Sequence, residues 1–253
     1  MKAAPLIAEF RRRKTVRPVL VHTGQHYDEN MSKIFFDDLG LPEPDIYLGV
    51  GSGTHAEQTA KVMIAFEKVL LEERPDVVIV VGDVNSTVAC SLTAAKLHVP
   101  VAHVEAGLRS FDLEMPEEIN RMITDVLSRW CFTTSPEAEI NLAREGVGPE
   151  RIFFVGNIMI DSFELMAPKI RAAGVPAKLG LGARGYGVVT LHRPSNVDRR
   201  ETLEPIVEQL VAVAERLPLV FPVHPRTRAR LETFGLIERL EGAPGIRLLE
   251  PMA

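Results

Sequence analysis

Short apolar runs alternate with longer amphipathic segments along most of the chain, and this alternation predicts the fold. Apolar strands are predicted at residues 16–21, 76–81, 99–104, 130–133 and 152–155. Helices with one apolar face are predicted at residues 1–14, 32–39, 54–73, 85–97, 136–145 and 159–173, with a further helix beginning at Pro116. Since parallel strands need helical crossovers, the pattern predicts an α/β domain with a doubly wound parallel sheet.

Two local patterns sharpen this prediction. Thr54 followed by Glu57 is typical of a capping box, so the helix at residues 54–73 should begin there. The run DVVIVV at residues 76–81 is wholly apolar, as expected of a parallel strand buried on both faces.

The alternation stops in a Gly- and Ala-rich stretch and then restarts. Residues 174–185 have no periodicity and are predicted to be an interdomain linker. Beyond them, strands are predicted at residues 186–191, 219–223 and 246–248, and helices at residues 201–216 and 227–234. The chain is therefore divided into a Rossmann-like domain at residues 1–173, the linker, and a partial Rossmann-like domain at residues 186–253.

Composition narrows the function classes. The 253 residues are 46% hydrophobic and 25% charged, which is ordinary for a globular protein. A net charge of −5 gives no electrostatic case for nucleic-acid binding, although a small basic pocket for an anionic nucleotide stays possible. No apolar run is long enough to span a bilayer. Cys90 and Cys131 lie in apolar surroundings outside any CxxC pattern, which indicates reduced thiols in a cytoplasmic protein.

The most informative stretch is HVEAGLRSFDLEMPEEINR, residues 103–121. Glu105 and Arg109 follow a predicted strand, and Glu117 and Arg121 should share one face of the helix behind Pro116. Open α/β sheets bind ligands at the carboxyl ends of their strands, so these side chains are candidates for a site. The alternative interpretation is ordinary loop charges with one solvated ion pair.

A second strand end adds another carboxylate. Asp83 follows residues 76–81, so it could face the same cleft as Glu105, with Glu117 approaching from the helix. Clustered carboxylates can divide the tasks of holding and removing a proton, as abstraction at carbon and return to the opposite face require. The alternatives are a turn-forming Asp83 and a Glu105–Arg109 salt bridge.

Cationic residues end strands of the second domain. His192 and Arg193 follow residues 186–191, and His224 and Arg226 follow residues 219–223. Planar arginine donors suit phosphate oxygens, so these positions are candidates for nucleotide binding. A structural, hydrogen-bonded histidine is the alternative for His192.

These motifs together resemble one family. HVEAGLR with PEEINR, GDVNST at residues 82–87, VTLHRPSNVD at residues 189–198 and VHPRT at residues 223–227 resemble the non-hydrolysing UDP-N-acetylglucosamine 2-epimerases of bacteria and archaea. The resemblance implies two Rossmann-like domains of glycosyltransferase-B type. It also implies reversible conversion of UDP-N-acetylglucosamine to UDP-N-acetylmannosamine, by elimination and re-addition of UDP, for surface polysaccharide precursors.

The resemblance also implies roles for single residues. Asp83, Glu105 and Glu117 are then acid/base candidates, and Arg121 orients one of them. His192, which is also counted among the catalytic residues, is implied to engage UDP together with His224 and Arg226. The other residues implied to contact substrate are Lys2, His26, Arg109 and Arg193. In some bacterial members the segment around His26 helps bind an activating second UDP-sugar, but Tyr27 and Asp28 depart from the usual pair there and argue against activation. No metal or cofactor is implied, the partner is the UDP-sugar, and the complete protein is expected to be a homodimer.

The family pattern extends beyond both ends of this sequence. Its first strand and a Gly-Thr-Arg-Pro-Glu turn would precede Lys2, and further helices would follow residue 253, so the chain is expected to be truncated and both domains incomplete. The open alternatives are a 2-epimerase of a diacetylated or uronic UDP-sugar, a hydrolysing 2-epimerase, a glycosyltransferase of the same architecture, and an inactive fragment.

Overall fold

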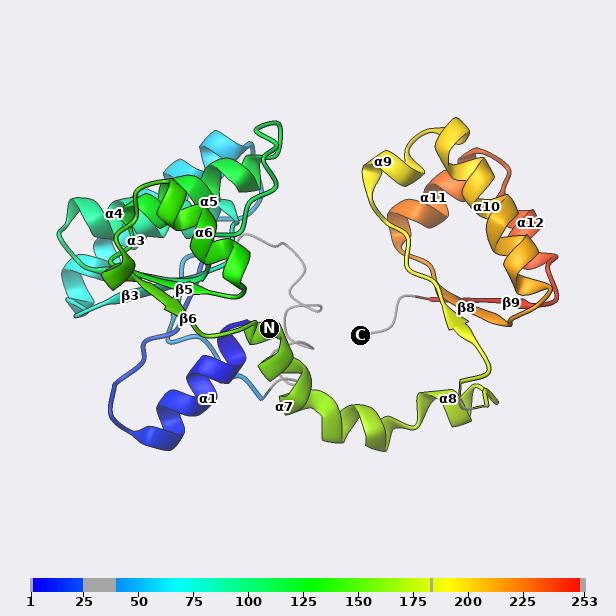
Figure 1. The fold of residues 1–253 in the computed structure, drawn as a ribbon, viewed down its shortest axis with the longest axis horizontal. Coiled ribbons are helices and arrows are strands. Elements are labelled where there is room, and N and C mark those ends of the chain that lie inside the picture. The colour runs from blue at the N-terminus through cyan, green and yellow to red at the C-terminus, as the bar shows by residue number, and fades with distance from the viewer. Residues whose placement is uncertain (1, 25–39, 183, 251–253) are drawn as a thin grey trace. The chain divides into compact units, whose positions relative to one another are not determined.

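The computed structural model describes residues 2–24, 40–182 and 184–250. Two compact units, Met1–Pro168 and Lys169–Ala253, make up the chain. Each unit has helices packed on a parallel sheet, which confirms the α/β class (Figure 1). No described helix is both long and apolar enough to cross a membrane. The helix predicted at residues 32–39 lies outside the described residues.

The first unit is built on a parallel sheet whose strands follow one another in chain order. Its strands are β3 (Val78–Val81), β4 (Val101–Ala106), β5 (Trp130–Thr133) and β6 (Ile152–Phe154). The crossover helices are α4 (Asn85–Lys96), α5 (Pro116–Leu127) and α6 (Pro136–Arg144). Because right-handed crossovers that advance in one direction stay on one side, all three lie on the same face of the sheet, as Figure 1 shows.

The remaining elements of this unit flank that sheet. Helix α3 (His55–Glu73) packs along α4, and α1 (Ala3–Arg13) lies on the other side of the sheet (Figure 1). Strands β1 (Val21–His22) and β2 (Ile46–Tyr47) form a separate parallel pair. A short 3₁₀ helix, η1 (Pro149–Arg151), precedes β6. The predicted capping box is confirmed, because the Thr54 hydroxyl accepts from the Glu57 amide and the Glu57 carboxylate accepts from the Thr54 amide.

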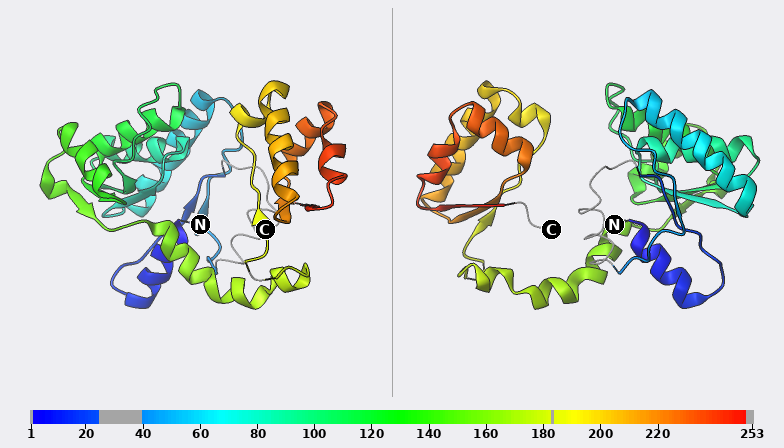
Figure 2. Two further views of the ribbon diagram at one scale, coloured as in Figure 1. Left: turned by 45° about the vertical axis from the view of Figure 1, so that its right-hand side comes forward. Right: turned by 180° about the vertical axis from the view of Figure 1, so that it is seen from behind.

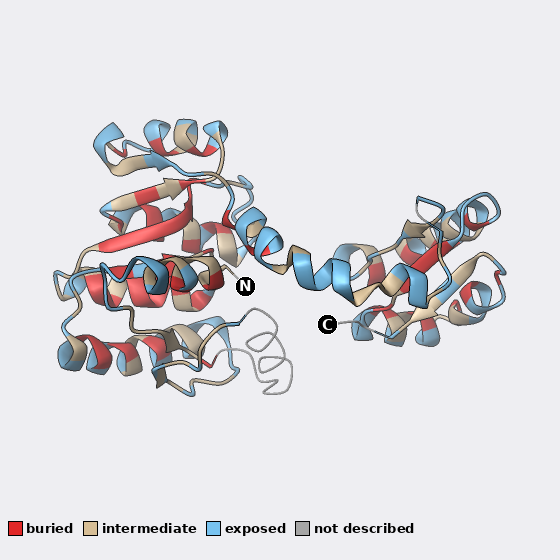
Figure 3. Ribbon diagram, turned by 90° about the horizontal axis from the view of Figure 1, so that it is seen from below, coloured by how far each residue is buried: buried red, intermediate tan, exposed pale blue. Residues whose placement is uncertain are grey.

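Burial of the sheet is asymmetric, which corrects one prediction. Every residue of β4 is buried, whereas β3 buries Val78 and Val80 but leaves Ile79 39% exposed. The strand at residues 76–81 is therefore not buried on both faces, because α4, α5 and α6 cover only one of them. Figure 3 shows the buried positions gathered between the elements of each unit.

The second unit repeats the arrangement on a smaller scale. Strands β7 (Gly187–Val188), β8 (Leu219–Pro222) and β9 (Ile246–Leu249) are parallel and in chain order. The helices are α8 (Val175–Lys178), α9 (Pro194–Val197), α10 (Arg200–Ala214), α11 (Pro225–Thr233) and α12 (Ile237–Glu241), seen from two sides in Figure 2. Its core centres on Phe221, Leu203, Leu231 and Leu240.

The boundary between the units lies within α7 (Ile158–Ala173). The proposed linker, residues 174–185, contains the helix α8 and belongs to the second unit.

Candidate functional site

The backbone at Glu105 is the most unusual feature of the first unit. The register of β4 against β5 shifts between Val104 and Ala106, so Glu105 forms a bulge. Its φ angle is +74°, and Gly82 and Gly107 beside it have φ angles of +75° and +78°. A left-handed conformation in a residue other than glycine costs about 1–3 kcal/mol and persists only where the surroundings enforce it. The chain therefore holds Glu105 in one orientation at the carboxyl end of the sheet.

The Glu105 carboxylate is buried and pairs with Lys2, which precedes α1. A methyl group on Gly82 would lie 3.6 Å from Glu105 Oε2 and 3.2 Å from Lys2 Nζ. This ion pair thus lies directly against the glycine that precedes Asp83. The alternative prediction, a salt bridge from Glu105 to Arg109, is wrong, because Glu105 pairs with Lys2 instead.

Asp83 is held by Arg121 across the end of the sheet. Arg121 Nε lies 2.9 Å from Asp83 Oδ2, and Arg121 Nη1 lies 2.6 Å from Glu118 Oε2. Asn120 Nδ2 donates to the Asp83 carbonyl at 2.9 Å. The side chain of Asp83 keeps 30% of its surface exposed, so it stays open to a ligand while one of its oxygens is bound.

The helix α5 brings a carboxylate into this group that the sequence interpretation missed. Arg121 pairs with Glu118, three residues away, whereas the predicted partner on its helix face was Glu117. Glu117 is half-buried in the first turn of α5. Glu118 is buried and accepts hydrogen bonds from the amides of Ser110 and Phe111, each at 3.0 Å. The sequence did contain a signal for this pair, because Arg121 lies three residues after Glu118, the second glutamate of PEE.

These contacts set the ionisation of Glu118. Burial alone would raise the pKa of this carboxyl, but the amides of Ser110 and Phe111 and the Arg121 guanidinium bring the pKa below its ordinary value of 4.5. A lowered folded-state pKa means that the stabilisation is complete above the unfolded-state pKa and is lost as the pH falls.

We therefore expect Glu118→Gln to lower the free energy of unfolding at pH 7 by about 1–3 kcal/mol. The difference from wild type should shrink as the pH falls below 4.5, because the wild-type carboxyl then loses its charge as well. Urea titrations followed by the fluorescence of Trp130, the single tryptophan, would measure it. The exposed Glu114→Gln serves as the control. An equal difference at pH 7 and pH 3 would contradict this assignment.

Arg109 does not fit its predicted role in substrate binding. Its side chain is only 1% exposed, with Nη1 2.8 Å from Asp125 Oδ2 and Nη2 2.5 Å from Glu145 Oε2. Burial alone would lower the pKa of this guanidinium, but the carboxylates of Glu145 and Asp125 raise it. The guanidinium is thus occupied by two carboxylates inside the unit, the buried Asp125 and the partly exposed Glu145. His26, also predicted to contact substrate, lies outside the described residues.

The cationic residues of the second unit follow its strands along the chain, with His192 four residues beyond the end of β7 and His224 two residues beyond the end of β8. The rings of His192 and His224 are 5.6 Å apart, and both residues are exposed. His224 begins α11, where its Nδ1 accepts from the Arg226 amide at 3.1 Å. Arg193, the residue that precedes α9, is exposed. These groups form an accessible cationic cluster.

One carboxylate faces this cluster. Asp198 accepts two hydrogen bonds from Arg226, from Nε at 3.0 Å and from Nη2 at 2.5 Å, and Arg230 lies 3.3 Å away. Hydrogen bonding to Arg226, opposed by slight desolvation and aided by Arg230, lowers the pKa of Asp198. Asp198 thus orients the guanidinium of Arg226 while leaving it half exposed.

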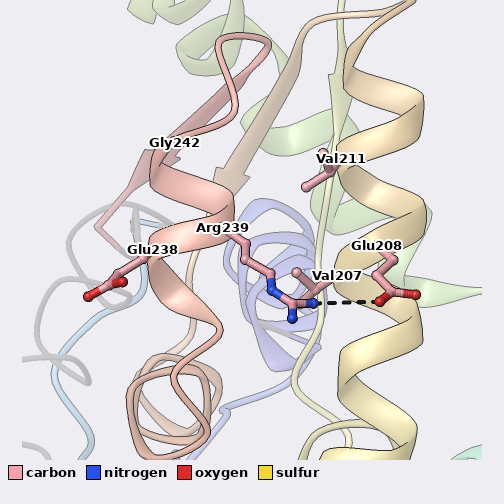
Figure 4. A pocket seen from close by; sticks show the side chains of 6 residues that line it. All are labelled: Val207, Glu208, Val211, Glu238, Arg239 and Gly242. Atoms are coloured by element: carbon pink, nitrogen blue, oxygen red, sulfur yellow. Dashed lines mark ion pairs between the residues drawn. The ribbon is translucent and has the colours of Figure 1, made fainter.

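A shallow hollow elsewhere in the second unit is distinct from this cluster. It lies between α10 and α12 and is lined by Val207, Glu208, Val211, Glu238, Arg239 and Gly242 (Figure 4). Arg239 pairs with Glu208 across it at 3.5 Å. None of the predicted site residues lines it. In the described part of the chain, no group of His, Cys, Asp and Glu side chains is arranged to hold a metal ion.

Comparison with known proteins gives a consistent result. A family model described as UDP-N-acetylglucosamine 2-epimerase matches residues 8–253. A UDP-N-acetylglucosamine 2-epimerase of Methanocaldococcus jannaschii is 46% identical over 239 residues, which cover 92% of this chain and 65% of that protein. A UDP-2,3-diacetamido-2,3-dideoxy-D-glucuronate 2-epimerase of Pseudomonas aeruginosa is 43% identical over 240 residues, covering 93% of this chain and 66% of that protein.

A solved structure extends the likeness to three dimensions. The crystal structure of the Methanocaldococcus jannaschii UDP-GlcNAc 2-epimerase in complex with UDP-GlcNAc and UDP matches with a TM-score of 0.82 at 44% identity. The match covers 100% of this chain and 70% of that one. The predicted fold class, with Rossmann-like domains of glycosyltransferase-B type, is confirmed. The chain spans about two thirds of the length of these relatives.

Proposed function

The chain belongs to the UDP-N-acetylglucosamine 2-epimerase family, and from this premise we propose that it interconverts UDP-N-acetylglucosamine and UDP-N-acetylmannosamine at C2. The observation that carries the proposal is the buried, conformationally strained Glu105 at the carboxyl end of β4, beside the Asp83–Arg121 pair. Strain of this kind is characteristic of functional sites, and the paired carboxylates suit proton transfer at carbon.

We propose that Asp83, Glu105 and Glu117 carry the proton chemistry. One carboxylate removes the C2 proton, the electron pair of that C–H bond forms a C1=C2 double bond, and the C1–O bond to UDP breaks. A phosphate oxygen of UDP then bonds again to C1, while a carboxylic acid returns a proton to the opposite face of C2. Arg121 fixes the orientation of Asp83 throughout, and Lys2 holds Glu105 in place.

The cationic cluster of the second unit is proposed to bind the diphosphate. His192, Arg193, His224 and Arg226 supply exposed donors at strand ends. Arginine donors form strong, charge-assisted hydrogen bonds to phosphate oxygens, and an imidazole N–H can donate beside them. Binding through UDP fits a reaction in which UDP must leave C1 and be retained for re-addition.

Proton NMR in deuterium oxide tests the proposal. Incubation of the purified chain with UDP-N-acetylglucosamine should produce UDP-N-acetylmannosamine that carries deuterium at C2. Free N-acetylmannosamine with UDP would instead identify a hydrolysing enzyme. Absence of any exchange at C2, under conditions where the Methanocaldococcus jannaschii relative shows it, would overturn the proposal for this chain.

A second candidate substrate has a specific observation behind it. The Pseudomonas aeruginosa relative, named for a diacetamido glucuronate sugar, is nearly as similar as the Methanocaldococcus jannaschii one. The same NMR assay run with UDP-2,3-diacetamido-2,3-dideoxy-D-glucuronate would decide between them by the ratio of kcat/KM values. A larger value for the uronic sugar would reassign the substrate.

We place this reaction in the cytoplasm, as a supply of precursors for surface polysaccharide. Cys90 and Cys131 are free, buried thiols, and desolvation raises the pKa of each to about 12. Buried reduced cysteines of this kind are typical of proteins from reducing compartments.

We also propose a homodimer formed through α5. This helix buries Glu118, Asn120, Thr124 and Asp125. Its apolar side chains face outward instead, as an exposed stripe of Ile119, Met122, Ile123 and Val126. Exposed apolar stripes mark interaction sites, and a second copy across a two-fold axis would bury this one.

Ile123→Glu should therefore convert a dimer into a monomer, because it places a charge within that interface. Light scattering coupled to gel filtration would measure the mass. Val213→Glu, at an exposed position of α10 in the second unit, is the matched control and should stay dimeric. A monomeric wild type, or a dimeric Ile123→Glu variant, would contradict the assignment.

A further inference from the structure

Two fully buried side chains connect the strand ends that carry Asp83 and Glu105. His103 Nε2 lies 2.9 Å from the carbonyl oxygen of Gly82, and His103 Nδ1 lies 2.6 Å from Asp125 Oδ1. The other oxygen of Asp125 accepts from the Gly107 amide at 3.1 Å. One chain of hydrogen bonds thus runs from the residue before Asp83 to the bulge that contains Glu105.

The partners define which atoms of this network donate. The Gly82 carbonyl oxygen can only accept, so Nε2 of His103 donates to it, and Nδ1 shares a second hydrogen bond with Asp125. Arg109 Nη1 lies 2.8 Å from the second oxygen of Asp125, Oδ2. Glu145, whose side chain is 31% exposed, pairs with Arg109 on the far side of its guanidinium. Such a network is rigid. If one side chain moves, it leaves the polar group of its neighbour buried without a hydrogen bond, which costs free energy.

We propose that His103 and Asp125 are positioning residues that hold the carboxylates of the active site in register. Both side chains have no exposed surface, so they act on the reaction only through the backbone at Gly82 and Gly107. By fixing these residues they keep Glu105 in its left-handed conformation, facing the glycine that precedes Asp83. The inference rests on the proposed epimerase function, because it assigns these carboxylates to catalysis.

Two substitutions of Asp125 test whether its hydrogen bonds position the active-site carboxylates. Asp125→Asn keeps every link: its carbonyl oxygen accepts from Gly107, and its amide donates to Nδ1 of His103, whose Nε2–H still reaches Gly82. Asp125→Ala removes both links. A misplacement of reacting groups by about 1 Å costs about a hundredfold in rate. We therefore expect Asp125→Ala to lower kcat by about a hundredfold with KM nearly unchanged, and Asp125→Asn to stay within about tenfold of wild type.

A control at the far end of the network isolates the effect of stability. Glu145→Gln weakens the Arg109 contact but leaves the links to Gly82 and Gly107 intact, so it should reduce thermal stability without reducing kcat. If Asp125→Ala and Glu145→Gln lose kcat in the same proportion, or if Asp125→Ala changes KM and not kcat, the network is structural only and the inference is wrong.

Amide hydrogen exchange gives a readout that does not need turnover. The Gly107 amide should be protected in the wild type and in Asp125→Asn, and should exchange rapidly in Asp125→Ala. Unchanged protection of Gly107 in Asp125→Ala would overturn the inference even if the enzyme were slow. A wild type that is inactive on both UDP-sugars would refute the proposed function, and the exchange result would still decide whether Asp125 fixes the bulge.

Discussion

Replacement of Glu105 by glutamine is expected to lower kcat by about a thousandfold, since general acid–base groups contribute about 10²–10⁴ in rate. Glutamine has nearly the same shape and can still reach Lys2, but it cannot take a proton from C2 or return one. KM should change little, because the groups proposed to bind the diphosphate belong to the second unit. The loss should therefore appear in kcat, as expected for an interaction that matters only in the transition state.

Steady-state assays with UDP-N-acetylglucosamine, combined with deuterium incorporation at C2, would measure this effect. Glu114→Gln makes the same chemical change at an exposed position between β4 and α5 and should leave kcat unaltered. A Glu105→Gln variant that retained more than a tenth of the wild-type kcat would show that Glu105 has a structural function only. Asp83 and Glu117 would then be the remaining candidates.

Several elements were predictable because their signals are local. Strand β5 and the beginning of α5 lie where the apolar run and Pro116 place them, and the capping box at Thr54 forms as its spacing indicates. The strand-end positions of Asp83 and Glu105 also follow, since parallel strands place their carboxyl ends at one edge.

The partners of charged residues were not predictable in the same way. The residues around Arg109 in the sequence do not indicate that its guanidinium turns inward. Its partners, Asp125 and Glu145, come much later in the chain. An arginine at a strand end looks the same in sequence whether it awaits a ligand or is already paired. Glu105 pairs with Lys2 and not with Arg109, and this choice of partner depends on tertiary packing alone.

Helix α5 misleads for a different physical reason. Sequence patterns assume that the apolar face of a helix points to the core, but α5 buries Glu118, Asn120 and Asp125 and exposes its apolar residues. The side chains of Glu118, Asn120 and Asp125 can be buried because each of the three is hydrogen-bonded. The inversion turns Glu118, rather than Glu117, toward Arg121.

Substitution of Gly107 by alanine is expected to be the most destabilising single change in the first unit. The added methyl group would lie 2.4 Å from the Ala138 carbonyl oxygen, which is backbone and cannot move aside, and the φ angle of +78° adds strain. Overlap with a fixed neighbour together with a disfavoured backbone should cost about 4 kcal/mol or more. Gly146 provides the matched control, since its φ angle is +85° but no atom lies within 4 Å of the new methyl group.

Gly146→Ala should therefore cost only the strain of the backbone, about 1 kcal/mol. Urea unfolding followed by Trp130 fluorescence reports on this unit directly, because Trp130 in β5 pairs with Ala102 of β4. Equal losses for the two variants would show that backbone strain alone matters and that Ala138 yields. A much larger loss at Gly107 would show that α6 is pressed against the bulge, so that the packing of this helix, as well as the hydrogen bond from Asp125, keeps Glu105 in its strained orientation.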